Sequence, residues 1–233
     1  MLFNTELDPN YLGIPLVAGL TLLLAQIVNG KRKWLYAVLY LIVAAAIIFT
    51  SSRGNFLAAV ITSGLYFLVV LFNADVPQSK KIALMVILVL AALGVMMLGS
   101  HYLTEQWERM SEFGATADNG RFYLWSQSLQ EWEKNPIFGH GLGGMYRLIG
   151  KASHNTYLQL LSETGLIGVL LFIPLLFLYI RRTFIVDKVM FVVLIGVLFQ
   201  VVFLDALDSR CLWVVLIWIS MLPKKHKMEC RDD

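Results

Sequence analysis

The sequence predicts an all-α protein, a polytopic transmembrane helical bundle of about seven helices with one large extracytoplasmic loop. Of its 233 residues 58% are hydrophobic and only 15% are charged, which is too little charge to cover a water-soluble domain of this size. The apolar residues also fall in long runs, without the alternation of a strand or the single stripe of a surface helix. Such runs suit a bilayer core, which takes about 20 helical residues.

Seven apolar runs mark the expected membrane segments. Each is expected to be helical, because an open strand in lipid would leave its backbone N–H and C=O groups unpaired. The runs occupy residues 12–28, 34–50, 55–72, 82–99, 157–180, 189–204 and 211–222. The last run is short for a complete crossing, so the final hairpin either spans the membrane or re-enters it.

The placement of Lys and Arg predicts the orientation of these helices. Alternate junctions hold 12 of the 19 basic residues, as the positive-inside rule requires, and this puts the N-terminus outside the cell. The chain then divides into four transmembrane helices in 1–99, an extracytoplasmic loop in 100–153, two to three membrane helices in 154–223, and a cytoplasmic tail in 224–233.

The loop is expected to carry an interfacial amphipathic helix near residues 120–133. Phe122, Trp125, Leu129 and Trp132 recur on one helical stripe, and aromatic residues on one face are typical of the bilayer interface. Asp118-Asn119 offers a cap before this helix, Asn135-Pro136 ends it, and the turn at 139–144 is rich in glycine. The loop then returns to the membrane at His154.

Several function classes find no support in the sequence. It contains no HExxH motif, no paired metal-ligand spacing, no Ser-His-Asp signature and no Gly-rich nucleotide loop, so we expect no metal and no cofactor. The net charge of +3 reflects the basic junctions, and it predicts no nucleic-acid partner. Cys211 and Cys230 have no ligand or redox spacing.

Polar residues at the outer ends of the helices are the candidates for chemistry. Arg53 and Arg121 each lie near an expected helix start, where an arginine either binds an anion such as phosphate or interacts only with headgroups and water. His154 opens the fifth membrane helix and is either a general base, a phosphate contact or a polar residue at a helix start. Asp205, Asp208 and Arg210 form an outer turn whose simplest explanation is an internal ion pair.

Four sequence motifs resemble one known family. In SHNTYLQLLSETGLIG, at 153–168, His154 and Asn155 are followed after nine residues by Gly165 and then by Gly168. Together with the motifs at 50–54, at 120–143 and at 8–11, this resembles the C-terminal half of the O-antigen ligase and O-antigen or capsule polymerase superfamily. Members usually have ten or more membrane helices, so the chain is also compatible with a fragment or with one piece of a split protein.

The resemblance implies a glycosyltransferase in the cytoplasmic (inner) membrane of a bacterium. It would use an undecaprenyl-diphosphate-linked glycan as donor and act at the outer face as a polymerase or, with a lipid core as acceptor, as a ligase. Transfer would be inverting and metal-independent, and other polysaccharide-assembly membrane proteins are potential partners. A transporter or flippase, or an inactive membrane fragment, is the alternative of another class.

The resemblance also suggests roles for individual residues. Arg53 and Arg121 would bind and stabilise the diphosphate, and His154 would accept the proton of the acceptor hydroxyl or contact the diphosphate. His140, Arg147 and Asn155 are further substrate-binding candidates. Gly165 and Gly168 are expected to serve close helix packing.

Overall fold

The computed structural model describes residues 9–50, 52–98 and 120–221, and within them the protein is helical with no strand. The helices are α1 (Pro9–Asn29), α2 (Lys33–Phe49), α3 (Arg53–Leu71), α4 (Gln78–Leu98), α6 (Arg121–Lys134), α7 (Gly144–Ile149), α8 (Thr156–Val186), α9 (Lys188–Gln200), the 3-10 turn η2 (Val201–Phe203) and α10 (Arg210–Ser220). The expected cap at 118–119, the whole of the expected loop before it and the expected tail lie outside the described residues.

Three described helices are long and apolar enough to cross a membrane, namely Asn10–Asn29, Arg53–Leu71 and Thr156–Val186. The helices Lys33–Phe49, Lys188–Phe203 and Arg210–Ser220 are apolar but shorter. The predicted class, a helical membrane bundle, is confirmed. The number of seven spans stays a prediction, and so does the choice between a crossing and a re-entrant final hairpin.

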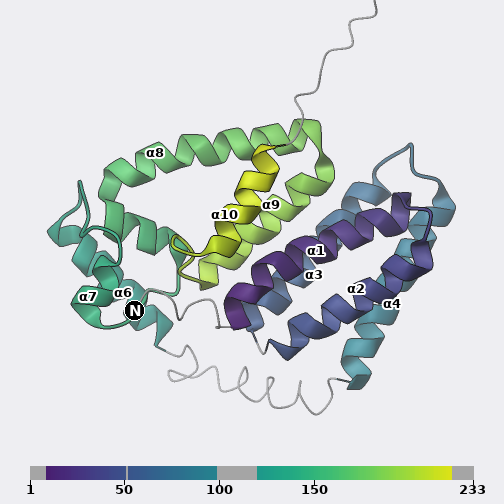
Figure 1. Ribbon diagram of the computed structural model, residues 1–233, viewed down its shortest axis with the longest axis horizontal. Coiled ribbons are helices and arrows are strands. Elements are labelled where there is room, and N and C mark those ends of the chain that lie inside the picture. Colours follow the sequence, from purple (N-terminus) through teal and green to yellow (C-terminus); the bar gives the residue numbers. More distant parts are fainter. Residues whose placement is uncertain (1–8, 51, 99–119, 222–233) are drawn as a thin grey trace, which may run out of the picture.

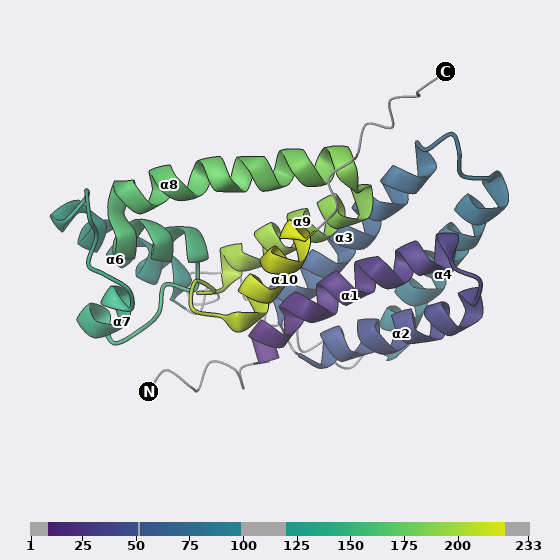
Figure 2. The same cartoon turned by 45° about the horizontal axis from the view of Figure 1, so that its top comes forward.

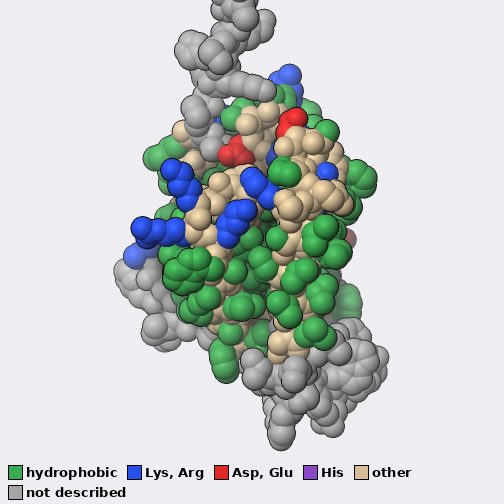
Figure 3. All heavy atoms as spheres, turned by 90° about the vertical axis from the view of Figure 1, so that its right-hand side faces the viewer, with side chains coloured by type: hydrophobic (Ala, Val, Ile, Leu, Met, Phe, Trp, Pro, Cys, Tyr) green, Lys and Arg blue, Asp and Glu red, His purple; other side chains and the backbone are tan. Residues whose placement is uncertain are grey.

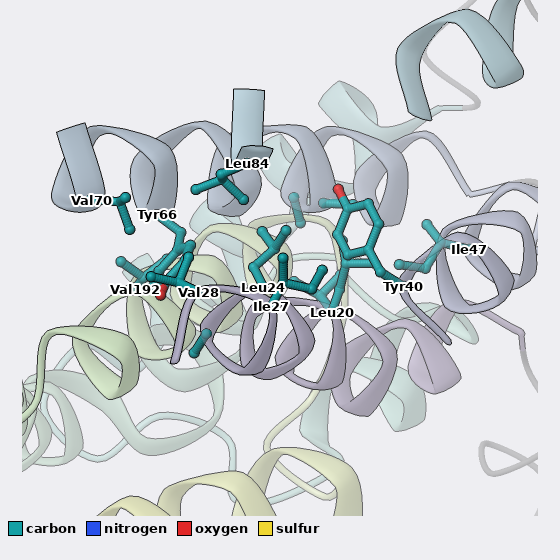
Figure 4. Close-up of a cluster of buried hydrophobic side chains, with 14 residues drawn as sticks. Leu20, Leu24, Ile27, Val28, Tyr40, Ile47, Tyr66, Val70, Leu84 and Val192 are labelled. Carbon is teal, nitrogen blue, oxygen red and sulfur yellow. The ribbon is translucent and has the colours of Figure 1, made fainter. Parts of the chain in front are cut away.

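Helix α1 lies at the centre of the bundle, and α8 lies at its edge. α1 packs against α2, α3 and α9, and apolar side chains such as Leu20, Leu24 and Val28 form a buried core with those of its neighbours (Figure 4). The apolar window of α1 is 61% buried and that of α8 only 11%. Exposed leucines of α8 such as Leu170 and Leu171 therefore suit contact with lipid.

The two ends of the bundle differ in charge and in structure. The α1–α2, α3–α4 and α8–α9 junctions lie toward one end, where Lys and Arg side chains gather (Figure 3). The opposite end carries α6 and α7 (Figure 1). Helices that begin at this second end have their free N–H groups there, and the candidate residues of the sequence lie among these helix starts. Which end faces the cytoplasm stays a prediction.

Helix α8 is broken near its start. Gly165 has φ 65° and ψ −166°, so a short segment before it and a long segment after it run in different directions (Figure 2). The left-handed φ is open to glycine at little steric cost. The break turns the first segment of α8, which begins after His154, toward α9 and α10.

Candidate functional site

The loop after α6 forms backbone hydrogen bonds with α8 on both sides of its break. The N–H groups of Leu166 and Ile167 donate to the carbonyls of Pro136 and Ile137, at 2.9 and 3.2 Å. In the other direction, the N–H of Gly141 donates to the Glu163 carbonyl at 2.8 Å. The loop therefore satisfies backbone groups that a broken helix would otherwise leave unpaired.

Two glycines make this backbone contact possible. A Cβ on Gly139 would lie 2.7 Å from the Gly165 nitrogen, and a Cβ on Gly165 would collide with the Ile137 carbonyl. The three atoms nearest to a Cβ on Gly168 would all belong to the Thr164 side chain. The expectation that the motif glycines serve helix–helix packing is wrong for Gly165, which creates a helix break that receives a loop. For Gly168 it stays a prediction.

Polar side chains in and next to the loop after α6 also stabilise this loop. The buried carboxylate of Glu163 accepts hydrogen bonds from the backbone N–H groups of Gly143 and Met145. His140 Nε2 lies 2.7 Å from the Glu131 carbonyl, and Arg147 donates to the carbonyls of Leu142 and His140 at 2.7 and 3.1 Å.

For two of the substrate-binding candidates, these contacts offer a structural role. His140 and Arg147 both hold the glycine-rich turn in place through these contacts. Asn155 likewise caps α8, because its side chain accepts from the N–H groups of Tyr157 and Leu158 at 3.0 and 3.2 Å. Binding of substrate by these three residues stays a prediction.

His154 is held in an unusual conformation by Asp205. Its φ of 52° lies in the left-handed region, which a histidine adopts uncommonly. Its backbone N–H donates to Asp205 Oδ2 at 2.5 Å, and its ring Nδ1 lies 3.6 Å from the same oxygen. Ser153 donates its hydroxyl to the other carboxylate oxygen. The imidazole remains 48% exposed, so a substrate can reach it.

Asp205 is buried in a polar turn after η2. Burial raises the pKa of this carboxyl above its ordinary value, while the hydrogen bonds from Ser153 and His154 act in the opposite direction. Its own carbonyl accepts from the Tyr11 hydroxyl at 2.8 Å, and the Leu204 carbonyl accepts from Thr156 at 2.6 Å. The sequence-based expectation for this turn was an internal ion pair. It did not include the partners that Asp205 has in the structure, which are Ser153 and His154.

The two candidate arginines begin two different helices. Arg53 is the first residue of α3 and Arg121 is the first residue of α6. The start of α3 is fixed to the end of α9, because the buried Gln200 side chain donates to Asn55 Oδ1 at 2.5 Å. Backbone N–H groups and the helix dipole at such starts favour an anion nearby.

Phe203 of η2 lies next to both helix starts. A Cβ on Gly54, the neighbour of Arg53, would be 3.2 Å from the Phe203 side chain. The Arg121 guanidinium carbon lies 5.8 Å from the centroid of the Phe203 ring. Asp205 follows two residues later, so the short segment 203–205 is contacted by Arg121, by His154 and by Gly54, the residue after Arg53.

The site therefore joins two cationic side chains at helix starts with a carboxylate–imidazole pair. Such a set can bind an anionic group and accept a proton close to it. Among the described residues, no group of three or more His, Cys, Asp and Glu side chains could hold a metal ion. The positive charge that the described part of the site offers to a phosphate comes from arginine.

Fold and site together define a helical integral membrane protein with a polar site at one end of its bundle. A family model described as O-antigen ligase matches residues 35–173, more than half of the chain, and the protein belongs to this family. The match includes Arg53, Arg121 and His154 and ends before Phe203 and Asp205. No curated protein and no solved structure among those compared matches the chain.

The family membership sets the broad activity. O-antigen ligase family proteins act on lipid-linked glycans in the membrane. The protein is thus a bacterial integral membrane enzyme of polysaccharide assembly, with a glycosyltransferase-like ligase or polymerase activity.

Proposed function

We propose that the protein polymerises undecaprenyl-diphosphate-linked oligosaccharide units at the outer face of the cytoplasmic membrane, as a multi-pass enzyme. One observation carries this proposal, namely that Arg121, His154 and Gly54, the residue after Arg53, each contact Phe203 or Asp205. A diphosphate leaving group needs positive charge beside it, and an acceptor hydroxyl needs a proton acceptor close by. O-antigen, capsule and exopolysaccharide repeat units all have this chemistry.

In the proposed reaction the acceptor oxygen attacks the anomeric carbon of the donor sugar. The bond between that carbon and the phosphate oxygen breaks, and undecaprenyl diphosphate leaves with the electron pair. Arg53 and Arg121 stabilise the negative charge that develops on the leaving group, since guanidinium groups bind phosphate oxygens through paired N–H donors. Because these arginines supply the charge, the reaction needs no metal, and a single displacement inverts the anomeric centre.

His154 accepts the proton that the attacking hydroxyl loses. The Asp205 carboxylate, 3.6 Å from Nδ1, favours a proton on that nitrogen and leaves Nε2 as the acceptor. Asp205 also fixes the backbone N–H of His154, so it sets both the position and the tautomer of the ring. Asp205 is a positioning residue, and His154 is the group that touches the acceptor.

Expression in two bacterial hosts tests the proposal. In a host that lacks its polymerase, a ladder of repeat units on an envelope-glycan gel is the expected result. In a host that lacks its ligase, transfer of existing polymer to the lipid core would instead identify a ligase and overturn the polymerase assignment. If neither host is rescued, the N-terminal half of a family member is supplied in trans, and continued failure with inserted protein would contradict an enzymatic role.

Point variants test the assignment of the residues. Arg53→Ala, Arg121→Ala and His154→Ala are expected to abolish the product while the protein still inserts. Lys151→Ala is the matched control, because it removes an exposed basic residue of the same loop and should leave the ladder unchanged. A normal ladder from the Arg53 and His154 variants would contradict the assignment.

A further inference from the structure

We propose that Phe203 is a positioning residue that holds the Arg121 guanidinium beside the start of α3, so that both arginines bind one diphosphate. The inference rests on the proposed function, and it assigns a role to a side chain outside the matched family region. Phe203 lies in η2 and is only partly buried. It is a large apolar side chain at a polar site.

The contacts of Phe203 join the two arginine positions. Its side chain packs against Gly54, where an added Cβ would approach to 3.2 Å. Its ring also lies under the Arg121 guanidinium, with 5.8 Å from the guanidinium carbon to the ring centroid. This distance is within the range of a cation–π interaction. One ring therefore connects the first turn of α3 with the first residue of α6.

A ring serves this purpose better than a carboxylate would. The electron-rich face of phenylalanine attracts the guanidinium without accepting its N–H groups in hydrogen bonds. A carboxylate would occupy those N–H donors and cancel the positive charge. The contact with Phe203 therefore helps to hold Arg121 in place without neutralising its charge, and a guanidinium group suits phosphate oxygens.

The Phe203 ring is itself held by a second aromatic ring. Phe199 meets Phe203 edge to face, with 5.6 Å between ring centroids and an interplanar angle of 70°, a favourable geometry for aromatic pairs. Phe199 belongs to α9, whose end is joined to α3 through Gln200 and Asn55. Phe203 is thus anchored to the same junction that places Arg53.

Binding of undecaprenyl diphosphate to the purified full chain in lipid nanodiscs tests the inference. Phe203→Leu and Phe203→Met both remove the ring and keep an apolar side chain, and each is expected to raise the Kd by about fivefold. Phe203→Tyr keeps an aromatic face and should bind like the wild type. Phe191→Leu is the matched control, because Phe191 forms a similar edge-to-face pair with Phe184 at the other end of α9.

A double-mutant cycle separates positioning from general packing. If Phe203 acts through Arg121, Phe203→Leu has no further effect on Kd in the Arg121→Ala background. Additive losses, or wild-type binding by both ring-free variants, would overturn the inference while the proposed function stands. Wild-type binding by Arg53→Ala and Arg121→Ala would instead contradict the proposed function, and the role of Phe203 would fall with it.

Discussion

Gly139 and Gly165 lie backbone to backbone, and neither position has room for a side chain. A Cβ on either residue would lie 2.7 Å from the backbone nitrogen of the other. Both residues also have a left-handed φ, 67° for Gly139 and 65° for Gly165. The glycine of the family motif and the glycine of the loop motif are therefore two halves of one junction, which fixes the loop after α6 to the break in α8.

Gly165→Ala is expected to lower the stability of the protein by about 2 kcal/mol or more, because it combines a strained φ with a collision against the Ile137 carbonyl. Thermal unfolding in detergent measures the effect. Gly64→Ala is the control, since nothing lies within 4 Å of a Cβ there and the residue is within a helix. Equal melting temperatures for the two variants would show that the junction contributes little.

Asp205→Asn is expected to lower kcat by about 100-fold, because the neutral amide no longer fixes the tautomer and charge of the His154 ring. A transfer assay with saturating donor measures this, and the KM for the donor should change little. Asp208→Asn, in the same turn but exposed, is the control. An Asp205→Asn enzyme with unchanged kcat would remove Asp205 from the mechanism.

The stability of the protein should depend on pH through Asp205. Burial raises the pKa of this carboxyl above 3.8, so the folded state holds the proton in a pH window where the unfolded state has released it. Stability of the wild type is therefore lost as the pH rises through that window, whereas Asp205→Asn loses nothing there.

The difference in melting temperature, variant minus wild type, is accordingly expected to increase as the pH rises above about 4 and to level off above the raised pKa. Asp205→Ala also lacks the carboxyl, so it should follow the same trend from a lower starting value. A difference that falls with pH would contradict the effect of burial.

A comparison of two buried hydrogen bonds tests whether the Gln200–Asn55 pair helps to place Arg53 in addition to stabilising the fold. Gln200→Leu removes a buried donor to Asn55 and is expected to cost about 1–3 kcal/mol of stability and to weaken donor binding through Arg53. Tyr40→Phe removes the buried hydrogen bond to Ser63, 3.1 Å long, and should reduce stability without changing donor binding. Equal donor Kd values for both variants would contradict a role of the pair in placing Arg53.

The replacement of each arginine by lysine tests the geometry of phosphate binding. Lys keeps the charge but lacks the planar pair of N–H donors, so Arg53→Lys and Arg121→Lys are each expected to lower kcat/KM for the donor by about tenfold or more. The assay varies the lipid-linked donor at fixed acceptor. Full activity in both variants would mean that a point charge is sufficient at these positions.

The sequence predicted the helical class, which the structure confirms, and it suggested the candidate site residues, because both depend on local signals. Long apolar runs must be helical in lipid, and His154 belongs to a motif of close spacing. The arginines were visible as charges at helix starts on the expected outer side. The structure adds that Arg121, His154 and the residue after Arg53 all contact the segment 203–205, which no single motif indicates.

Asp205 and Phe203 were not assigned to the site because their partners are distant in the chain. Asp205 is 51 residues from His154, and the simplest explanation of its turn from the sequence is an ion pair within the set Asp205, Asp208 and Arg210. Phe203 looked like the end of an apolar run. For Asp205 the sequence offers only a weak signal, namely an acidic residue in a short outer turn on the same expected side as His154. The backbone role of Gly165 depends on a dihedral angle, which the residue type permits but does not specify.

The late position of Asp205 in the chain has a consequence for biogenesis. His154 and both arginines leave the ribosome before the segment that holds Phe203 and Asp205, and only the final hairpin brings that segment to the His154 backbone. Synthesis that stopped after α8 would leave an inserted protein with its arginines in place and its histidine without a carboxylate. The enzyme would therefore acquire its activity only once the segment between α9 and α10 had been synthesised and had reached His154.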